Sequence, residues 1–228
     1  MENINSSQEL FLNIRKSIRL LYEYQKRMQG TMFHIKSVLN LSPAGRIEIN
    51  KLFSRAPRTS KDYGETQLSD GNWAWDYIYP MAMEYYLGER KLKDAEFRLS
   101  AIQVTDDGYY KARQQNLSPN RLDTYTFCPP EESSSLVLFV MEIKNRNSSW
   151  AKRWRRDAME DNLNRWMVDS SNVIDDVTMS GNHFIVMKFP IYELLTDISI
   201  SKVVDKINSH VQSLTGNTII WLGRSSIG

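Results

Sequence analysis

The chain has 228 residues, of which 41% are hydrophobic and 25% are charged. Such a composition is typical of a folded globular protein and excludes a chain that is disordered over its whole length. The formal net charge of +2 is too small to indicate binding to nucleic acid or to a membrane unless the charge is locally concentrated. The length suits one domain, with or without a helical extension.

Cys128 is the only cysteine, which excludes an intrachain disulfide and a cysteine-rich zinc site. A free thiol favours a reducing compartment, so we expect the protein to be cytoplasmic. The first residues show neither the basic nor the apolar region of a secretory signal. No apolar run approaches the roughly 18 residues that a membrane helix needs, so no membrane partner is expected.

A long helix is predicted at the N-terminus, beginning at a capping-box pattern over Ser6–Glu9. Gly30 weakens this helix by about 1 kcal/mol relative to alanine, so two helices in series are an alternative. Residues at alternating spacings of three and four form a heptad seam: Phe11, Ile14, Ile18, Leu21, Gln25, Met28, Met32, Ile35 and Leu39. Gln25 is its one polar member and could set register or oligomeric state.

The seam has two interpretations. It packs either on the core of its own domain or on a partner, in the manner of a coiled coil. In the second case the chain associates with itself or with another protein through residues 8–40. The predicted interface is then formed by Phe11, Ile14, Ile18, Leu21, Gln25 and Met28.

Residues 42–72 are predicted to be a linker between this helical arm, residues 1–41, and an α+β domain over residues 73–228. A short helix from Ser42-Pro43 to Leu52 is expected within the linker, since proline is tolerated in the first turn of a helix. The polar stretch from Ser54 to Asn72 favours a loop, either functional or a simple connector.

The domain begins with an aromatic-rich stretch, Trp73–Leu87, for which we predict mostly helix with Pro80 near its start. Aromatic residues dominate core packing, so a core role is favoured over base stacking. Asp-Gly at positions 107 and 108, between Glu96–Val104 and Tyr109–Arg113, predicts a β-hairpin. Residues 114–132 contain three prolines and favour a surface loop.

Later elements are predicted from apolar runs and helical periodicity. Leu136–Met141 is a continuous apolar run of the kind that forms a strand buried on both faces, and we expect it to continue to Lys144. The other elements are a helix over 149–168, a strand over 183–189, a helix over 200–214 that ends at Gly216, and a strand over 218–222. The sequence therefore predicts an α+β fold with a mixed sheet of about five strands flanked by helices.

The strongest candidate for catalysis is Glu142-Ile-Lys144 at the end of the predicted central strand. Its position resembles the E-x-K motif of the restriction-endonuclease-like PD-(D/E)XK superfamily. The resemblance covers about Trp73–Phe189 and implies a Mg²⁺-dependent nuclease. Glu142 and an upstream aspartate, Asp107 first and Asp123 second, would then hold the metal, and Lys144 would orient the attacking water. Glu84 would match a helical glutamate of some members, although no Pro-Asp dipeptide is present.

A second candidate is the basic, tryptophan-bearing start of the predicted 149–168 helix. Four cations lie near the positive end of the helix dipole, which favours an anionic ligand. Alternating charges later in the helix are equally consistent with a solvated surface. A phosphate, a nucleic-acid backbone or an acidic protein surface would contact Trp150, Lys152, Arg153, Arg155 and Arg156.

Other activities have little support in the sequence. The three histidines are scattered, and neither a P-loop nor a Rossmann glycine motif is present. We therefore expect a non-catalytic binding protein without a cofactor, which associates through its N-terminal helix and presents the basic helix to an anionic partner. The alternatives are the metal-dependent nuclease and a purely structural assembly subunit.

Overall fold

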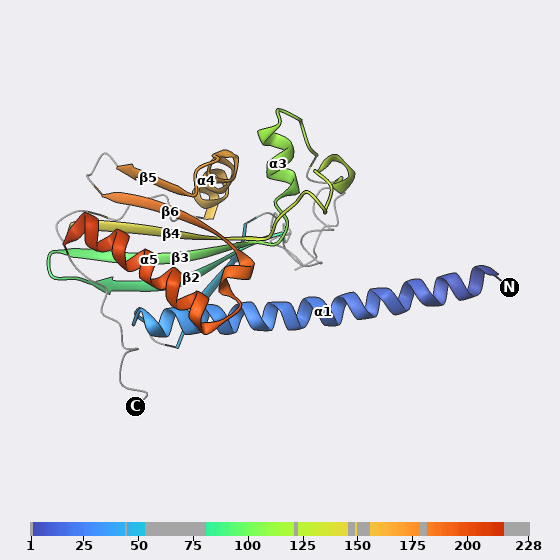
Figure 1. Cartoon of the computed structure of the whole chain (residues 1–228), viewed down its shortest axis with the longest axis horizontal. Coiled ribbons are helices and arrows are strands. Elements are labelled where there is room, and N and C mark those ends of the chain that lie inside the picture. Colours follow the sequence, from blue (N-terminus) through green and yellow to red (C-terminus); the bar gives the residue numbers. More distant parts are fainter. Residues whose placement is uncertain are drawn as a thin grey trace, which may run out of the picture.

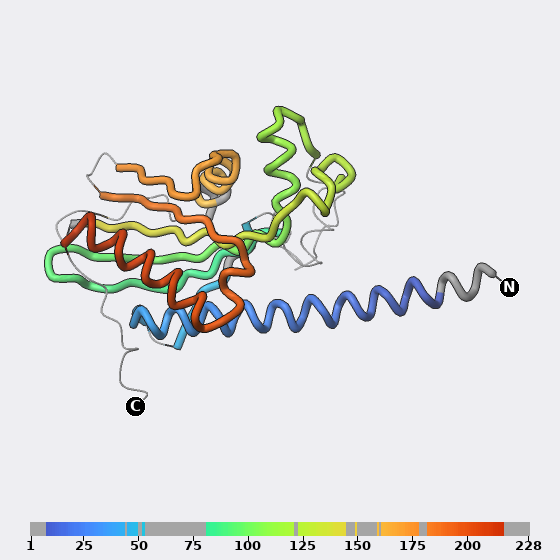
Figure 2. Tube along the Cα trace, viewed as in Figure 1, coloured from blue at the N-terminus to red at the C-terminus, as the bar shows by residue number. Residues whose placement is uncertain are grey.

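The computed structural model describes residues 2–43, 45–52, 81–120, 123–145, 149, 156–177 and 182–216. Their elements are α1 (Glu2–Val38), β1 (Glu48–Lys51), β2 (Ala82–Lys91), β3 (Ala95–Val104), α3 (Gly108–Gln114), η1 (Thr124–Thr126), β4 (Leu136–Asn145), α4 (Arg156–Val168), β5 (Val173–Val177), β6 (His183–Pro190), η3 (Ile191–Leu194) and α5 (Asp197–Thr215). Figure 1 shows one sheet with helices on both faces, and Figure 2 follows the chain through it.

The strands form one six-stranded sheet with the order β1-β2-β3-β4-β6-β5. Every pairing between these strands is antiparallel. The predicted α+β fold with a long N-terminal helix is confirmed. The sheet has six antiparallel strands where we expected about five in a mixed sheet, because β1, β2 and β5 were not anticipated. The expected strand over Tyr109–Arg113 is wrong, since these residues belong to α3.

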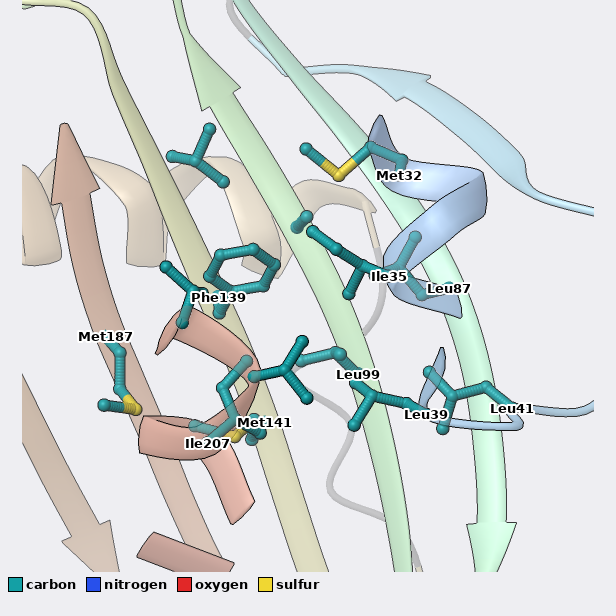
Figure 3. Packing of buried hydrophobic residues seen from close by; sticks show 14 of the residues in the cluster. Met32, Ile35, Leu39, Leu41, Leu87, Leu99, Phe139, Met141, Met187 and Ile207 are labelled. Carbon is teal, nitrogen blue, oxygen red and sulfur yellow. The ribbon is translucent and has the colours of Figure 1, made fainter. Parts of the chain in front are cut away.

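The central strand is β4, which lies between β3 and β6. Its apolar run is buried on both faces, as predicted, with every residue from Val137 to Met141 fully inaccessible to solvent. Val137, Phe139 and Met141 lie in the core under α1 and α5, part of which Figure 3 shows. Leu138 and Val140 lie in a second core that includes α4.

β6 and α5 also follow the prediction. β6 covers the predicted strand over 183–189 and ends at Pro190. α5 contains the predicted apolar positions and ends where Gly216 adopts a left-handed conformation, with φ of 65°. A Thr196–Ser199 capping box begins this helix. In the described part of the chain, no helix combines the length and the apolar content needed to cross a membrane.

Two predictions around β2 and β3 are wrong. Residues 82–87 belong to β2, not to a helix, and this strand pairs with β1 on one side and β3 on the other. The Asp-Gly pair does not form a hairpin turn. Asp107 is instead the N-cap residue of α3. The hairpin joins β2 to β3, where the Leu92 amide donates to the Ala95 carbonyl at 2.9 Å.

The predicted short helix from Ser42 to Leu52 is also wrong. Residues 48–51 form β1, which pairs with β2 from Tyr86 to Met83. Ser42 forms an isolated bridge with Glu89. The alternation of apolar and polar residues in Ile47-Glu-Ile-Asn was the available signal for a strand, but it covers only four residues. The sheet thus includes residues that we assigned to the linker.

Helix boundaries differ from the prediction at two places. α1 already runs from Glu2, so Ser6 lies inside it and does not cap it, and the helix continues through Gly30. α4 is described from Arg156 to Val168, and Ser149 is outside any helix. The predicted loop 54–72, the aromatics from Trp73 to Tyr79 and the strand 218–222 lie outside the described residues.

Candidate functional site

α1 divides into a packed half and an exposed half. Met28, Met32, Ile35 and Leu39 have at most 3% of their surface exposed and belong to the core on the sheet. Residues 8–22, which we call the free half of α1, are exposed apart from the half-buried Leu21. Figure 1 shows this half projecting away from the sheet. The interpretation that the seam packs on its own domain is therefore confirmed for the packed half, and contact with a partner stays a prediction for the free half.

Four exposed apolar residues, Leu10, Phe11, Ile14 and Ile18, lie on the same side of α1 as the buried ones. Leu10 and Met28 are 18 residues apart, as are Ile14 and Met32, and 18 residues make five helical turns. Exposure changes along this stripe from 58% at Leu10 and 44% at Ile14 to 3% and 0% at the methionines. The face that packs on the sheet thus continues beyond it.

The free half is apolar on this side, whereas its charged residues lie on the other sides together with Leu12 and Leu20. Phe11 and Ile18 are 58% and 61% exposed and extend the stripe. The remaining large apolar side chains that are exposed here are Leu10, Leu12, Ile14, Leu20 and Tyr22. The charged residues of the same segment, all exposed, are Glu9, Arg15, Lys16 and Arg19. Contiguous exposed apolar surface of this kind marks a contact site, whereas single exposed apolar residues do not.

Gln25 marks the change from the free to the packed half. Its side-chain amide donates to the Tyr85 hydroxyl and lies 3.2 Å from the Met83 sulfur. The Tyr85 hydroxyl in turn donates to Gln103 Oε1 at 2.8 Å. Nearby, Arg27 Nη2 donates to the Leu195 carbonyl at 2.7 Å. Two of the six predicted interface residues, Gln25 and Met28, are therefore used within the chain, because the sheet reaches this far along α1.

A cluster of buried polar residues lies on the sheet face opposite to α1. Glu142 is completely buried, and its Oε2 accepts from Arg98 Nη2 at 2.5 Å and Nε at 3.1 Å. Its other oxygen accepts from Asn182 Nδ2 at 2.7 Å. Beside this pair, Ser100 donates to Glu84 at 2.7 Å. We call Glu84, Arg98, Ser100, Glu142 and Asn182 the polar cluster.

Burial governs the electrostatics of the polar cluster. It lowers the pKa of Arg98 to about 10, and the carboxylate of Glu142 is the largest influence in the opposite direction. Lys144, two residues along β4, pairs with Glu96 at 2.8 Å and is 6% exposed. Sequence reasoning missed Arg98 and Asn182. The alternation of Glu96-Phe-Arg-Leu-Ser100 was a signal for Arg98, since a strand with this pattern has one polar face.

The predicted catalytic aspartate lies far from Glu142. Asp107 Oδ1 accepts from the Ser134 amide at 2.6 Å and lies 3.5 Å from Lys111 Nζ. Arg98 pairs with Glu142 in the β3–β4 ladder, whereas Asp107 follows the other end of β3, beyond Val104. Six residues of strand from Arg98 to Val104 span about 20 Å. The structure therefore does not bring the two carboxylates together.

Metal ligation has no support in the described residues. Among them, no three His, Cys, Asp or Glu side chains gather in a way that could hold an ion. Asp123, the second candidate, caps η1 by accepting from the Tyr125 amide at 3.1 Å. The part of the basic cluster formed by Trp150, Lys152, Arg153 and Arg155 lies outside the described residues, and Arg156 is the first residue of α4. The anion site stays a prediction.

Comparison with known proteins identifies a family for this chain but suggests no activity. Its sequence matches no curated protein and no solved structure. It does match a family model with the description PM0109 over residues 4–216. This range runs from the first turn of α1 to Gly216, the residue after α5, so the match covers both the arm and the sheet. The chain belongs to the PM0109 family.

Proposed function

We propose that this chain is a non-catalytic binding protein whose interaction surface is the apolar side of the free half of α1. The observation that carries the proposal is the exposure of Phe11, Ile14 and Ile18, at 58%, 44% and 61%, on a helix whose other half packs through the same side. Isolated helices of this length are marginal in water, so such a segment gains stability from a partner. The partner is a protein, either a second copy or another chain.

A photo-crosslinking amino acid tests this proposal. Placed at Ile14 in the full-length protein, in the cells that make it, it should yield discrete crosslinked protein species. The same probe at Lys16, which is exposed on the far side of the helix, is the matched control and should yield few or none. Equal crosslinking from both positions, or none from Ile14, would show that this side is not a binding surface.

The proposal also includes an anionic ligand for Lys152, Arg153, Arg155 and Arg156, and a cytoplasmic location consistent with the free thiol of Cys128. Replacing the four cations with glutamine is expected to lower affinity for single-stranded DNA by about tenfold or more and to flatten its salt dependence. Fluorescence anisotropy at two salt concentrations measures both. Unchanged affinity would remove the anion site from the proposal.

The nuclease alternative predicts metal-dependent cleavage of nucleic acid, and the proposed binding function predicts none. We expect no Mg²⁺- or Mn²⁺-dependent cleavage of single- or double-stranded DNA or RNA, since Glu142 pairs with Arg98 and Asn182 and Asp107 lies at the other end of β3. The wild-type protein and the Glu142→Gln and Asp107→Asn variants should show the same absence of cleavage. Cleavage that both substitutions abolish in folded protein would instead make this chain an enzyme.

A further inference from the structure

We infer that the partner of the free half of α1 is the same segment of a second copy, paired with it in antiparallel orientation. This inference rests on the proposed function and names the partner for the same surface. Three features of α1 support it: the common direction of its exposed and buried sides, the length of the free half, and the placement of its charges.

The common direction excludes a parallel pair. From Met28 onward, the side of α1 that carries the stripe lies against the chain's own sheet. In a parallel pair, both sheets would have to occupy the space between the two helices. In an antiparallel pair the sheets lie at opposite ends, and only the free halves face each other.

The length of the free half defines the register. An alignment that places Phe11 opposite Ile14 of the second copy pairs seam positions within the free half, and it also places Leu10 beside Ser17. Ile14 lies 11 residues, or about 16 Å along the helix, from Gln25, where α1 begins to contact the sheet through Tyr85. The sheet of each copy therefore does not occupy the space in which the two free halves pair.

The charges fit this register. In an antiparallel pair, residues that flank the seam on the same side meet each other. Here Gln8 meets Arg15 of the second copy, and Leu10 meets Ser17. Glu9, Lys16 and Arg19 occupy outer positions of the heptad and point away from the contact. No two like charges meet, whereas an alignment of Ile14 with Ile18 would bring the two Arg15 side chains together.

Sedimentation equilibrium of the full-length protein tests the second copy. The expected mass is twice the 26.6 kDa of one chain. Ile14→Glu should weaken the pairing by about 100-fold or more, because each pair would bury two carboxylates. Lys16→Glu introduces the same residue at an outer position and should keep the pair intact. A monomer at several hundred micromolar, or a mass above two chains, would overturn the inference.

Disulfide crosslinking tests the orientation. In a Cys128→Ser background, Leu10→Cys and Ser17→Cys are mixed and mildly oxidised, with helicity checked by circular dichroism. The antiparallel register predicts disulfides between the two different variants, since Leu10 and Ser17 are about 10 Å apart along one helix. Disulfides within each variant alone would show a parallel pair. A monomeric chain that still crosslinks to another protein from Ile14 would overturn self-pairing and leave the proposed function intact.

Discussion

Replacing Glu142 with alanine is expected to lower the free energy of unfolding by about 3–5 kcal/mol, because removing one partner of a buried ion pair leaves the other charge uncompensated. The side chains of Glu142 and Arg98 are only 0% and 8% exposed. The substitution also removes an acceptor of the buried Asn182. Burial already lowers the pKa of Arg98 to about 10 against the pull of this carboxylate. Denaturation in urea measures the change.

Two further variants separate the ion pair from other effects. Glu131→Ala removes an exposed carboxylate and should change stability by no more than about 0.5 kcal/mol. The double replacement of Arg98 by Met and Glu142 by Leu should recover most of the loss, since apolar residues of similar volume often replace a buried pair without penalty. A Glu142→Ala protein as stable as wild type would show that the polar cluster does not depend on this pair.

The elements that the sequence predicted best are those whose signal is local and strong. β4 and β6 are apolar runs bounded by polar residues, and α5 has both regular spacing and Gly216 at its end. The missed strands lack such signals. β5 contains Asp175 and Asp176 at the sheet edge, and β1 has four residues. Asp-Gly serves equally for a hairpin turn and for a helix start, and only the surrounding fold decides between them.

The candidate site was predictable in part for the same reason. The heptad seam identified the side of α1 that carries apolar residues. It could not show where the sheet ends along the helix, because that depends on the packing of Met83 and Tyr85 from β2. Likewise, the sequence around Glu142 and Lys144 does not indicate which residues they pair with. Arg98 and Glu96 lie 44 and 48 residues upstream and meet them only through the β3–β4 register.

The junction between α1 and the sheet depends on a glycine in β2. Gly88 has φ of 123° and lies at the irregularity where the β2–β3 register shifts. A Cβ atom at this position would lie 2.2 Å from the Ser42 carbonyl oxygen. That oxygen accepts from the Glu89 amide at 2.8 Å, and Lys36 donates to the Leu87 carbonyl beside it. The chain that leaves α1 is thus held against β2 where only glycine fits.

Gly88→Ala is therefore expected to lower the free energy of unfolding by about 2–5 kcal/mol, combining the strain of a positive φ with a clash against backbone. The matched control is Gly30→Ala in the middle of α1, where a Cβ meets nothing within 4 Å. This control should stabilise the protein by about 0.5–1 kcal/mol. Because Gly88 fixes the packed half of α1, its substitution should also increase hydrogen exchange from Met32 to Leu41 relative to wild type. Equal stability of the two variants would show that the chain after α1 can move away from β2 without loss.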